Sequence, residues 1–450
     1  MLPPRRRIGT EAKSRLGKAL AGPSFLIRIS QASLVTILLI VFVAFIDLSA
    51  YGSPALVPAS IHLSAAIRHS GVHIYNDTTA PFFDESTSAF RQRFLEWSAR
   101  HPADDSIFVS IASFRDNLCR ETVAALFANA NRPERVFVGI CDQLVVSDPD
   151  DRPCLDMVDE RFRPQIRVVQ VPADRGAGPT HARYIASKLW AGETWFMQID
   201  SHTKFLKGWD DHLVAMIKRL PDPERSIVTH YPVGSETVLG DAPRPWICRS
   251  THDNAPPGLI IQLPETCNDD NMSPGIALDD RGQKTTCFTP FLGAGFFAGR
   301  STLLHDAPFD PYLKFLFHGE ELLIAARLWT SGWELYTPSA NLVSHAYGGR
   351  PKNVFVQVPT WFVHAHASEA RARALLRNPL EMDKEGDYAK YSRAEMDELG
   401  MGTVRRLEDY LEYAGVDLID GKLTSRCNMW FDPVSGKWNS VGVNAAQSPS

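Results

Sequence analysis

The sequence predicts an α/β fold in which a mostly parallel central sheet is covered by helices on both faces. Two observations support this prediction. Short apolar segments that are typical of buried strands alternate with helical segments between Ser106 and Ile199, and parallel strands need such helical connections. The chain has 450 residues, of which 44% are hydrophobic and 22% are charged, so it can bury one large domain or two ordinary domains.

The order of these segments predicts the first half of the sheet. We expect strands at residues 106–113, 135–141, 166–171 and 195–199, and helices at residues 118–130 and 180–190. Ligands of parallel sheets bind beyond the carboxyl ends of the strands. Polar or glycine-rich residues follow each expected strand, at 113–116, 142–143, 173–179 and 200–202. This pattern locates a site without specifying its chemistry, because every strand ends in a loop.

The second half of the chain begins with a long irregular segment. Residues 232–290 are rich in Pro, Gly, Asn and Asp and are too long for a simple connection, so we expect an acceptor-binding insertion or lid. A helix at 320–330 and a short strand at 341–344 follow. We expect residues 351–450 to form a helical extension and tail, with helices near 368–377 and 405–413.

The N-terminal part of the chain carries a candidate membrane anchor. Residues 32–46 form a run of fifteen residues without a charge, and all seven Lys and Arg residues of the first 28 positions precede it. This asymmetry keeps the N-terminus cytoplasmic and places the body in the lumen. A cleaved signal peptide and a buried core helix are the alternatives. We therefore expect a cytoplasmic basic tail at 1–31, a transmembrane signal anchor at 32–47, a lumenal stem at 48–104 and a catalytic domain at 105–350.

The charge distribution argues against nucleic acid as a partner. The net charge of the chain is −5, and the basic N-terminal segment leaves the remainder at about −11. Nucleic-acid binding needs clustered positive charge on the folded surface. An anionic nucleotide remains compatible with this charge, because a metal ion can bridge its phosphates to acidic side chains.

The cysteines predict disulfides. The chain has seven cysteines, and none of them forms the C-x-x-C pair of a zinc site. In a lumenal domain, scattered cysteines form disulfides. Their odd number implies at least one unpaired thiol, and their connectivity cannot be deduced from the sequence.

The tripeptide Asp200-Ser201-His202 is a candidate metal site. It follows an expected strand, and side chains two residues apart point to the same side of a strand. A carboxylate and a neutral imidazole suit Mn²⁺, which can bridge the phosphates of a nucleotide diphosphate. The alternative is an aspartate that caps the next helix beside a solvated histidine.

Several spaced motifs occur in a fixed order along the chain. They are SIASFRD at 110–116, GICDQ at 139–143, AR at 182–183, QIDSH at 198–202, GAGFFAG at 293–299, HGEELLIAARLW at 318–329 and LGMGTVRRLEDYLEYAGVD at 399–417. In this order they resemble glycosyltransferase family 60, the polypeptide α-N-acetylglucosaminyltransferases, and more distantly the polypeptide N-acetylgalactosaminyltransferases. Both are retaining enzymes of the GT-A fold. The resemblance extends over residues 107–415 and implies a GT-A-like nucleotide-diphospho-sugar transferase domain.

The resemblance also implies roles for individual residues. Asp200 and His202 would bind Mn²⁺ with His345 as the third protein ligand. Without the motifs around it, His345 is better explained as a strand-end or core histidine, and the motifs reverse this interpretation. Glu320 would line the sugar and acceptor site and act with Asp200 in catalysis. The donor nucleotide would contact Ser113, Phe114, Arg115, Asp116, Arg175, Arg183 and Arg350.

The function that the resemblance implies is Mn²⁺-dependent transfer of N-acetylglucosamine from UDP-GlcNAc to a hydroxyl of a protein or glycoprotein acceptor. The acceptor residue would be Ser, Thr or hydroxyproline, and transfer would take place on the front face with retention. A Golgi or ER membrane location follows from the signal anchor. The alternatives are a transferase that uses UDP-GalNAc or another UDP-sugar, a metal hydrolase, and an inactive lumenal carbohydrate-binding or scaffold protein.

Overall fold

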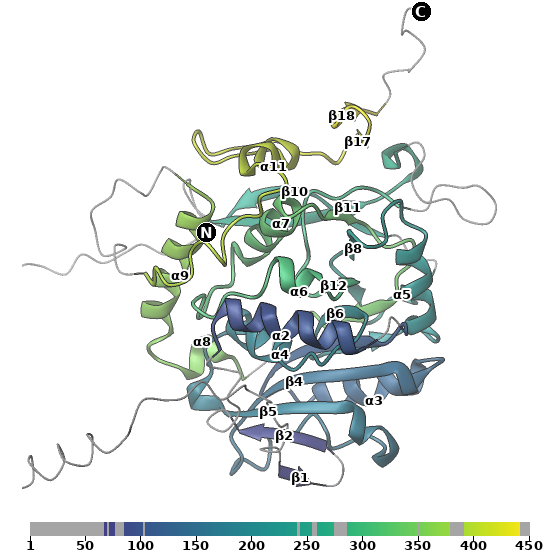
Figure 1. Cartoon of the computed structure of the whole chain (residues 1–450), viewed down its shortest axis with the longest axis vertical. Coiled ribbons are helices and arrows are strands. Elements are labelled where there is room, and N and C mark those ends of the chain that lie inside the picture. Colours follow the sequence, from purple (N-terminus) through teal and green to yellow (C-terminus); the bar gives the residue numbers. More distant parts are fainter. Residues whose placement is uncertain are drawn as a thin grey trace, which may run out of the picture. The chain divides into compact units, whose positions relative to one another are not determined.

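The structure of the chain is a computed structural model, shown in Figure 1. It describes residues 67–69, 72–76, 85–101, 104–240, 244–253, 259–273, 286–348, 352–378 and 391–441. The expected tail at 1–31, the expected anchor at 32–47 and Arg350 lie outside the described residues. Among the helices of the described ranges, none combines the length and the apolar character that crossing a membrane requires.

A large central sheet dominates the described part of the chain. Its nine described strands follow the order β1-β2-β5-β4-β3-β6-β12-β8-β13. The run from β2 to β6 is parallel throughout, and β13 is parallel to β8. The strands β1 and β12 pair antiparallel with their neighbours. The sheet strands are β1 (Ile67–His69), β2 (Val72–Asn76), β3 (Ile107–Phe114), β4 (Val136–Leu144), β5 (Ile166–Pro172), β6 (Trp195–Asp200), β8 (Ser226–Thr229), β12 (Phe296–Arg300) and β13 (Glu334–Tyr336).

Helices pack on this sheet, which confirms the mixed α/β class. The described helices are α2 (Thr87–Arg100), α3 (Cys119–Asn129), α4 (Pro179–Ser187), α5 (Trp209–Lys218), α6 (Leu303–Asp306), α7 (Glu320–Thr330), α8 (Val354–Gln357), α9 (Trp361–Leu375) and α11 (Leu407–Ala414). Helix α4 crosses β3, β4 and β5, and α5 contacts β8. The central strand β3 is an almost continuous buried apolar run, as expected of a parallel strand that is covered on both faces.

The sheet begins within the segment expected as a stem. Strand β2 pairs in parallel with β5 along residues 73–76, and α2 follows directly before the core. Phe90 and Phe94 of α2 are buried, and Phe94 stacks on Trp190 with ring centroids 4.1 Å apart. The last part of the expected stem is therefore built into the folded body.

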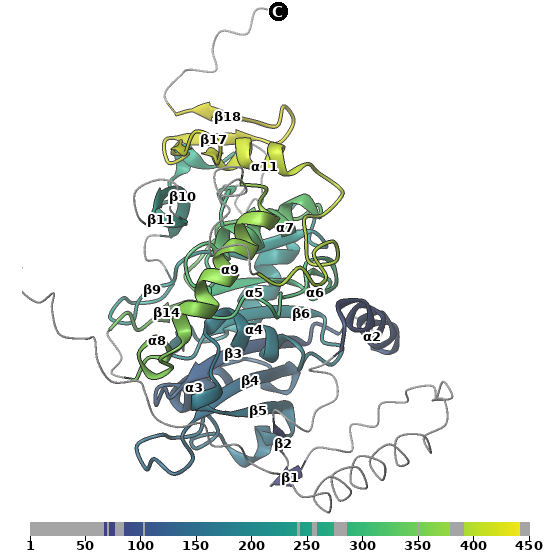
Figure 2. The ribbon, with the colours of Figure 1, turned by 90° about the vertical axis from the view of Figure 1, so that its left-hand side faces the viewer.

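A second, smaller sheet lies beside the carboxyl end of β6. It consists of β7 (Thr203–Phe205), β14 (Val343–His345) and β9 (Val233–Gly234), with β14 in the middle. Figure 2 shows β9 and β14 together next to α8. This sheet brings the end of β14 to the end of β6, although the two strands are far apart in the sequence.

Hairpins and disulfides hold the remaining segments. Strands β10 (Pro245–His252) and β11 (Ile260–Thr266) form a hairpin within the expected insertion, and β15 (Val416–Asp417), β16 (Lys422–Leu423), β17 (Met429–Asp432) and β18 (Lys437–Ser440) form two more near the C-terminus. Disulfides join Cys119 to Cys154, Cys248 to Cys427 and Cys267 to Cys287. Cys141 is free and buried. The expected disulfides with one unpaired thiol are confirmed.

Candidate active site

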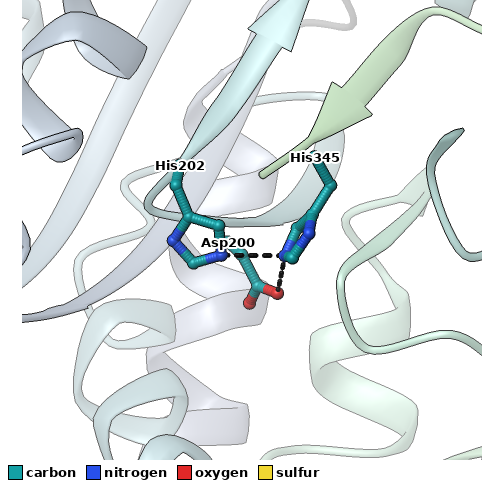
Figure 3. A group of neighbouring side chains, drawn as sticks. All are labelled: Asp200, His202 and His345. Carbon is teal, nitrogen blue, oxygen red and sulfur yellow. Dashed lines mark hydrogen bonds and ion pairs between the residues drawn. The ribbon is translucent and has the colours of Figure 1, made fainter. Parts of the chain in front are cut away.

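Asp200, His202 and His345 converge at the carboxyl end of β6. Figure 3 shows the two imidazoles and the carboxylate pointing toward one another. The Nε2 atoms of His202 and His345 are 2.8 Å apart, and His345 Nε2 lies 3.1 Å from Asp200 Oδ2. Both histidines are buried, and the possible ligand atoms of the three residues lie within 4.8 Å of one another. The three expected metal ligands therefore form one cluster.

Asp116 holds the orientation of His202. Its Oδ2 lies 2.8 Å from His202 Nδ1 and accepts a hydrogen bond from Ser201 Oγ at 2.7 Å. Burial acts to raise the pKa of Asp116, but the hydrogen bonds from His202 and Ser201 outweigh it and hold this pKa below its usual value. An imidazole that donates from Nδ1 to a carboxylate presents Nε2 as an acceptor or metal ligand. The contact therefore directs His202 Nε2 into the cluster.

Arg183 joins the cluster to Glu320. Its guanidinium donates to Asp200 Oδ1 at 2.9 Å and to Glu320 Oε2 at 2.6 Å. Burial acts to raise the pKa of Asp200, but the hydrogen bond from His345 and the charge of Arg183 hold it well below its usual value. Glu320 is 2% exposed, and its Oε1 has no hydrogen-bond partner among the described residues. One carboxylate oxygen at the start of α7 is thus available to a ligand.

Glu321 lies in a different environment from its neighbour. Its Oε1 accepts a hydrogen bond from the backbone N–H of Ala294 at 2.8 Å, and the hydroxyl of Tyr231 donates to Oε2. Burial, reinforced by the charge of Glu320, raises the pKa of Glu321 to about 7. Glu321 is therefore partly protonated near neutral pH. Tyr231 could not be predicted from the sequence, because no motif contains it and its contact with α7 arises only in the fold.

A pocket of about 210 Å³ lies over the carboxyl ends of β3, β4 and β6. The expected donor-binding residues Ser113, Phe114, Asp116 and Arg183 line it together with Asp200 and His202. Two of the three candidate metal ligands, Asp200 and His202, thus face the pocket, which lies where the sequence predicted a ligand site.

Two expected donor contacts do not line this pocket. Arg115 has a left-handed backbone, with φ of 50°, and its guanidinium binds Asp151 at 2.6 Å, Gln357 at 2.7 Å and also Asp148. Arg175 is exposed in the turn before α4. Arg115 therefore holds the loop after β4 against α8.

The segment that begins α8 supplies pocket residues that sequence reasoning missed. Lys352, Asn353, Val354 and Phe355 line the pocket with Phe317. Lys352 also binds Asp148 at 3.3 Å and Asp151. These residues belong to the segment expected as a C-terminal extension, so this wall of the pocket lies beyond the expected catalytic boundary at residue 350. Their positions depend on long-range packing, which leaves no local pattern.

A known protein family matches most of the chain. The family described as "Glycosyltransferase (GlcNAc)" matches residues 106–161 and 150–420. A comparison with curated proteins gives no match.

Solved structures resemble the chain at low sequence identity. A crystal structure of GalNAc-T7 with UDP, GalNAc and Mn²⁺ is 14% identical and covers 81% of this chain and 69% of that chain, with a TM-score of 0.45. A structure of S. aureus TarS in complex with UDP-GlcNAc is 15% identical and covers 61% and 68%, with a TM-score of 0.37. The mannosyltransferase PcManGT from Pyrobaculum calidifontis with GDP-Man and Mn²⁺ is 14% identical and covers 64% and 70%, with a TM-score of 0.34.

The family match confirms the resemblance to N-acetylglucosaminyltransferases that the spaced motifs suggested. It spans most of the chain, from the first residues of the core through α11, and it includes Asp200, His202 and His345. The chain belongs to the glycosyltransferase (GlcNAc) family.

Proposed function

We propose that this glycosyltransferase transfers N-acetylglucosamine from UDP-GlcNAc to a hydroxyl of a protein acceptor, with retention and with Mn²⁺ as its metal. The observation that carries the proposal is the convergence of Asp200, His202 and His345 at the opening of a pocket that strand ends form. The acceptor residue is Ser, Thr or hydroxyproline in this proposal. N-acetylglucosamine as the sugar rests on the motifs of the family.

The donor set fits a divalent metal ion. Two imidazole Nε2 atoms at 2.8 Å cannot both donate to each other, and a carboxylate oxygen lies beside them. The lone pairs of these two nitrogens and of the carboxylate oxygen all face inward. This arrangement is favourable when a cation lies among them. One carboxylate and two imidazoles suit Mn²⁺, which also accepts the phosphate oxygens of a nucleotide diphosphate. When bound, such an ion stabilises the charge that develops on the departing UDP.

Arg183 and Glu320 are suited to position the donor sugar. The buried Arg183 guanidinium fixes both Asp200 and Glu320, so the metal cluster and the start of α7 keep one relative geometry. The Oε1 of Glu320 remains available to accept a hydrogen bond from a sugar hydroxyl. A buried acceptor without a partner costs about 1–3 kcal/mol, which substrate binding would recover.

The hairpin β10–β11 is the proposed acceptor side. Leu259 directly precedes β11, and its side chain lies close to Gly319. A Cβ atom at position 319 would be 3.2 Å from this side chain. Asp253 follows β10, and its carboxylate lies 3.4 Å from His318 Nδ1. Both contacts place the end of this hairpin next to the residues that precede Glu320. An acceptor that lies on this hairpin would present its hydroxyl to the sugar held at Glu320.

Release of UDP tests the proposed activity. The full-length chain is supplied with a panel of UDP-sugars and Ser-, Thr- and hydroxyproline-containing peptides, with Mn²⁺ or with EDTA. We expect turnover that selects UDP-GlcNAc, requires Mn²⁺ and is lost in Asp200→Asn. The matched control is Asp174→Asn, which removes an exposed carboxylate before α4 and should leave the rate unchanged. Selection of another UDP-sugar would refute the donor, and absence of any turnover by the folded protein would refute the transferase activity.

The anomeric configuration of the product tests retention. Proton NMR of the glycosylated peptide distinguishes the α from the β linkage by the coupling constant of the anomeric proton. We expect the α linkage, which is the configuration of the donor. A β-linked product would refute front-face transfer.

We further propose that the chain is a single-pass type II protein of the Golgi or ER membrane with its catalytic domain in the lumen. The charge asymmetry around residues 32–47 supports this orientation. The three disulfides also support it, because disulfides persist in oxidising compartments. Protease protection of a C-terminal tag in sealed microsomes is the expected result, and digestion of the tag without detergent would refute the orientation.

A further inference from the structure

A second cavity lies at the C-terminal end of α7. It has a volume of about 900 Å³, and α7, α11 and the hairpin β17–β18 form its walls. Figures 1 and 2 both show α11 and this hairpin at the end of the folded body that is opposite β1 and β2. The disulfide between Cys248 and Cys427 attaches the base of the hairpin to β10. The cavity shares no lining residue with the pocket over the metal cluster.

Aromatic rings form much of the cavity wall. The rings of Trp329, Tyr413 and Trp438 pack in a row. The ring centroids are 5.6 Å apart for Trp329 and Tyr413 and 5.4 Å apart for Tyr413 and Trp438. Phe431 lies 5.3 Å from Trp438. Trp438 is half-buried on the hairpin, so its ring forms the accessible side of this cluster. Flat apolar surfaces of this kind bind ligands that present flat C–H faces.

Two polar atoms at this cavity are buried without a partner. Among the described residues, neither Trp329 Nε1 nor Glu334 Oε2 has a hydrogen-bond partner. The first is an N–H donor and the second is an acceptor. A buried polar atom that is left unsatisfied destabilises the protein. A ligand that offers both donors and acceptors would satisfy both atoms, whereas a purely apolar ligand would satisfy neither.

The charges around the cavity favour a neutral ligand. Four acidic and three basic side chains line it. Arg405 donates to Glu334 at 2.6 Å and lies 4.1 Å from the centroid of the Trp329 ring. Arg426 donates to the backbone oxygens of Glu412 and Tyr413. Since these two arginines are already engaged, the cavity offers little to attract a phosphate or a carboxylate.

We propose that this cavity is a second carbohydrate-binding site, which takes a neutral oligosaccharide. A sugar ring has an apolar C–H face that can pack on Trp438 and Tyr413. Its hydroxyls are both donors and acceptors, so one ring can pair with Trp329 Nε1 and with Glu334 Oε2. The volume of about 900 Å³ lies within the range of ligand pockets.

The cavity and the candidate active site lie at opposite ends of the same helix, α7. Trp329 and Glu320 belong to the same helix, nine residues apart. At 1.5 Å per residue they are separated by about 14 Å along the helix axis. An acceptor that already carries a glycan could therefore occupy the cavity while another of its hydroxyls lies near Glu320.

Calorimetric titration of the full-length chain tests the proposal. The probes are chitotriose, mannotriose and lactose, in EDTA and without nucleotide, so that the metal cluster takes no part. The variants are Trp438→Ala, Glu334→Gln and Trp329→Phe, which removes only the ring N–H and part of the ring. The matched control is Trp430→Ala, because Trp430 lies on the same hairpin between two lining residues and does not itself line the cavity. Asp200→Asn is the control for the catalytic site.

We expect at least one of these saccharides to bind and each cavity variant to weaken its Kd by about tenfold, as loss of one buried hydrogen bond or stacking contact does. Trp430→Ala and Asp200→Asn should bind as the unmodified chain does. No binding of any probe at millimolar concentrations would overturn the proposal. Equal weakening by Trp430→Ala and Trp438→Ala, or loss of binding in Asp200→Asn alone, would overturn it as well. Because the assay needs neither donor nor metal, its outcome is separate from that of the transferase assay.

Discussion

The contact between Asp116 and His202 gives the sharpest test of the metal cluster. Asp116 is 7% exposed, and its Oδ2 lies 2.8 Å from His202 Nδ1. The change Asp116→Asn removes the negative charge and keeps the shape of the side chain. An amide oxygen can still accept from His202 Nδ1, but it no longer makes the imidazole a stronger ligand. The cluster itself, with Asp200 and His345, keeps all its atoms.

The expected effect is a loss of metal affinity at nearly constant kcat. Replacement of a residue that orients a metal-binding histidine costs about 10- to 100-fold in metal affinity, or about 1.4 to 2.8 kcal/mol. The assay is the Mn²⁺ dependence of UDP release, with direct Mn²⁺ binding followed by electron paramagnetic resonance. We expect the half-saturating Mn²⁺ concentration of Asp116→Asn to rise by this factor and excess Mn²⁺ to restore most of the rate.

Two outcomes would refute this reasoning. An unchanged Mn²⁺ affinity would mean that the carboxylate of Asp116 does not act through His202. A rate that excess Mn²⁺ cannot restore, with normal Mn²⁺ binding, would instead assign Asp116 to the donor pocket that it also lines. Asp174→Asn serves as the control for loss of a carboxylate at the same edge of the sheet, and thermal unfolding of each variant checks that the fold is retained.

Three further predictions concern catalysis and stability. Glu320→Gln should lower kcat by at least about tenfold, because it weakens the charged contact with Arg183. The affinity for UDP, measured by calorimetry, should stay nearly unchanged, because the three candidate metal ligands are retained. An unchanged kcat would refute the role of Glu320. Burial raises the pKa of Asp142 to about 7, so the folded state favours the protonated carboxyl group. Its contribution to the free energy of unfolding is fully present below the pKa of the unfolded state and is lost as the pH rises through 7. Asp142→Asn should therefore increase Tm more at pH 8 than at pH 5, and an equal shift at both values would contradict this assignment. Replacement of Cys248 and Cys427 by Ser removes a link across 179 residues and should lower the free energy of unfolding in urea by roughly 2–4 kcal/mol.

The elements that the sequence predicted well are those with a local pattern. Strands β3 to β6 each begin within one residue of the expected position, and α7 has the expected bounds, Glu320–Thr330. Each is a run of apolar or amphipathic residues whose period specifies its type. Strand β2, which lies between β1 and β5, was missed because its five residues lie in a segment without sustained periodicity. Its strand conformation is held by long-range pairing with β5 and by pairing with β1.

The donor-binding residues show the limit of transfer from motifs. Ser113, Phe114 and Asp116 line the pocket as expected, whereas Arg115 turns to the loop after β4. Its left-handed backbone ends the alternation of side chains along β3. A motif specifies which residues occur together, but the side on which each lies depends on such backbone turns. The pocket wall from α8 carries no motif and follows from packing alone.

The metal cluster depends on the register of a three-residue strand. His345 is paired with Thr203 across β14 and β7, and Ser344 with Lys204. This register places His345 next to His202, which directly precedes Thr203. A slip of one residue in β14 would turn the side chain of His345 to the other face of the small sheet. Taken by itself, His345 was better explained as a strand-end or core histidine, and only the surrounding motifs indicated a metal ligand. About 140 residues separate His202 from His345 in the sequence. The fold of this segment places β14 between β7 and β9, where only one register brings His345 to Asp200 and His202.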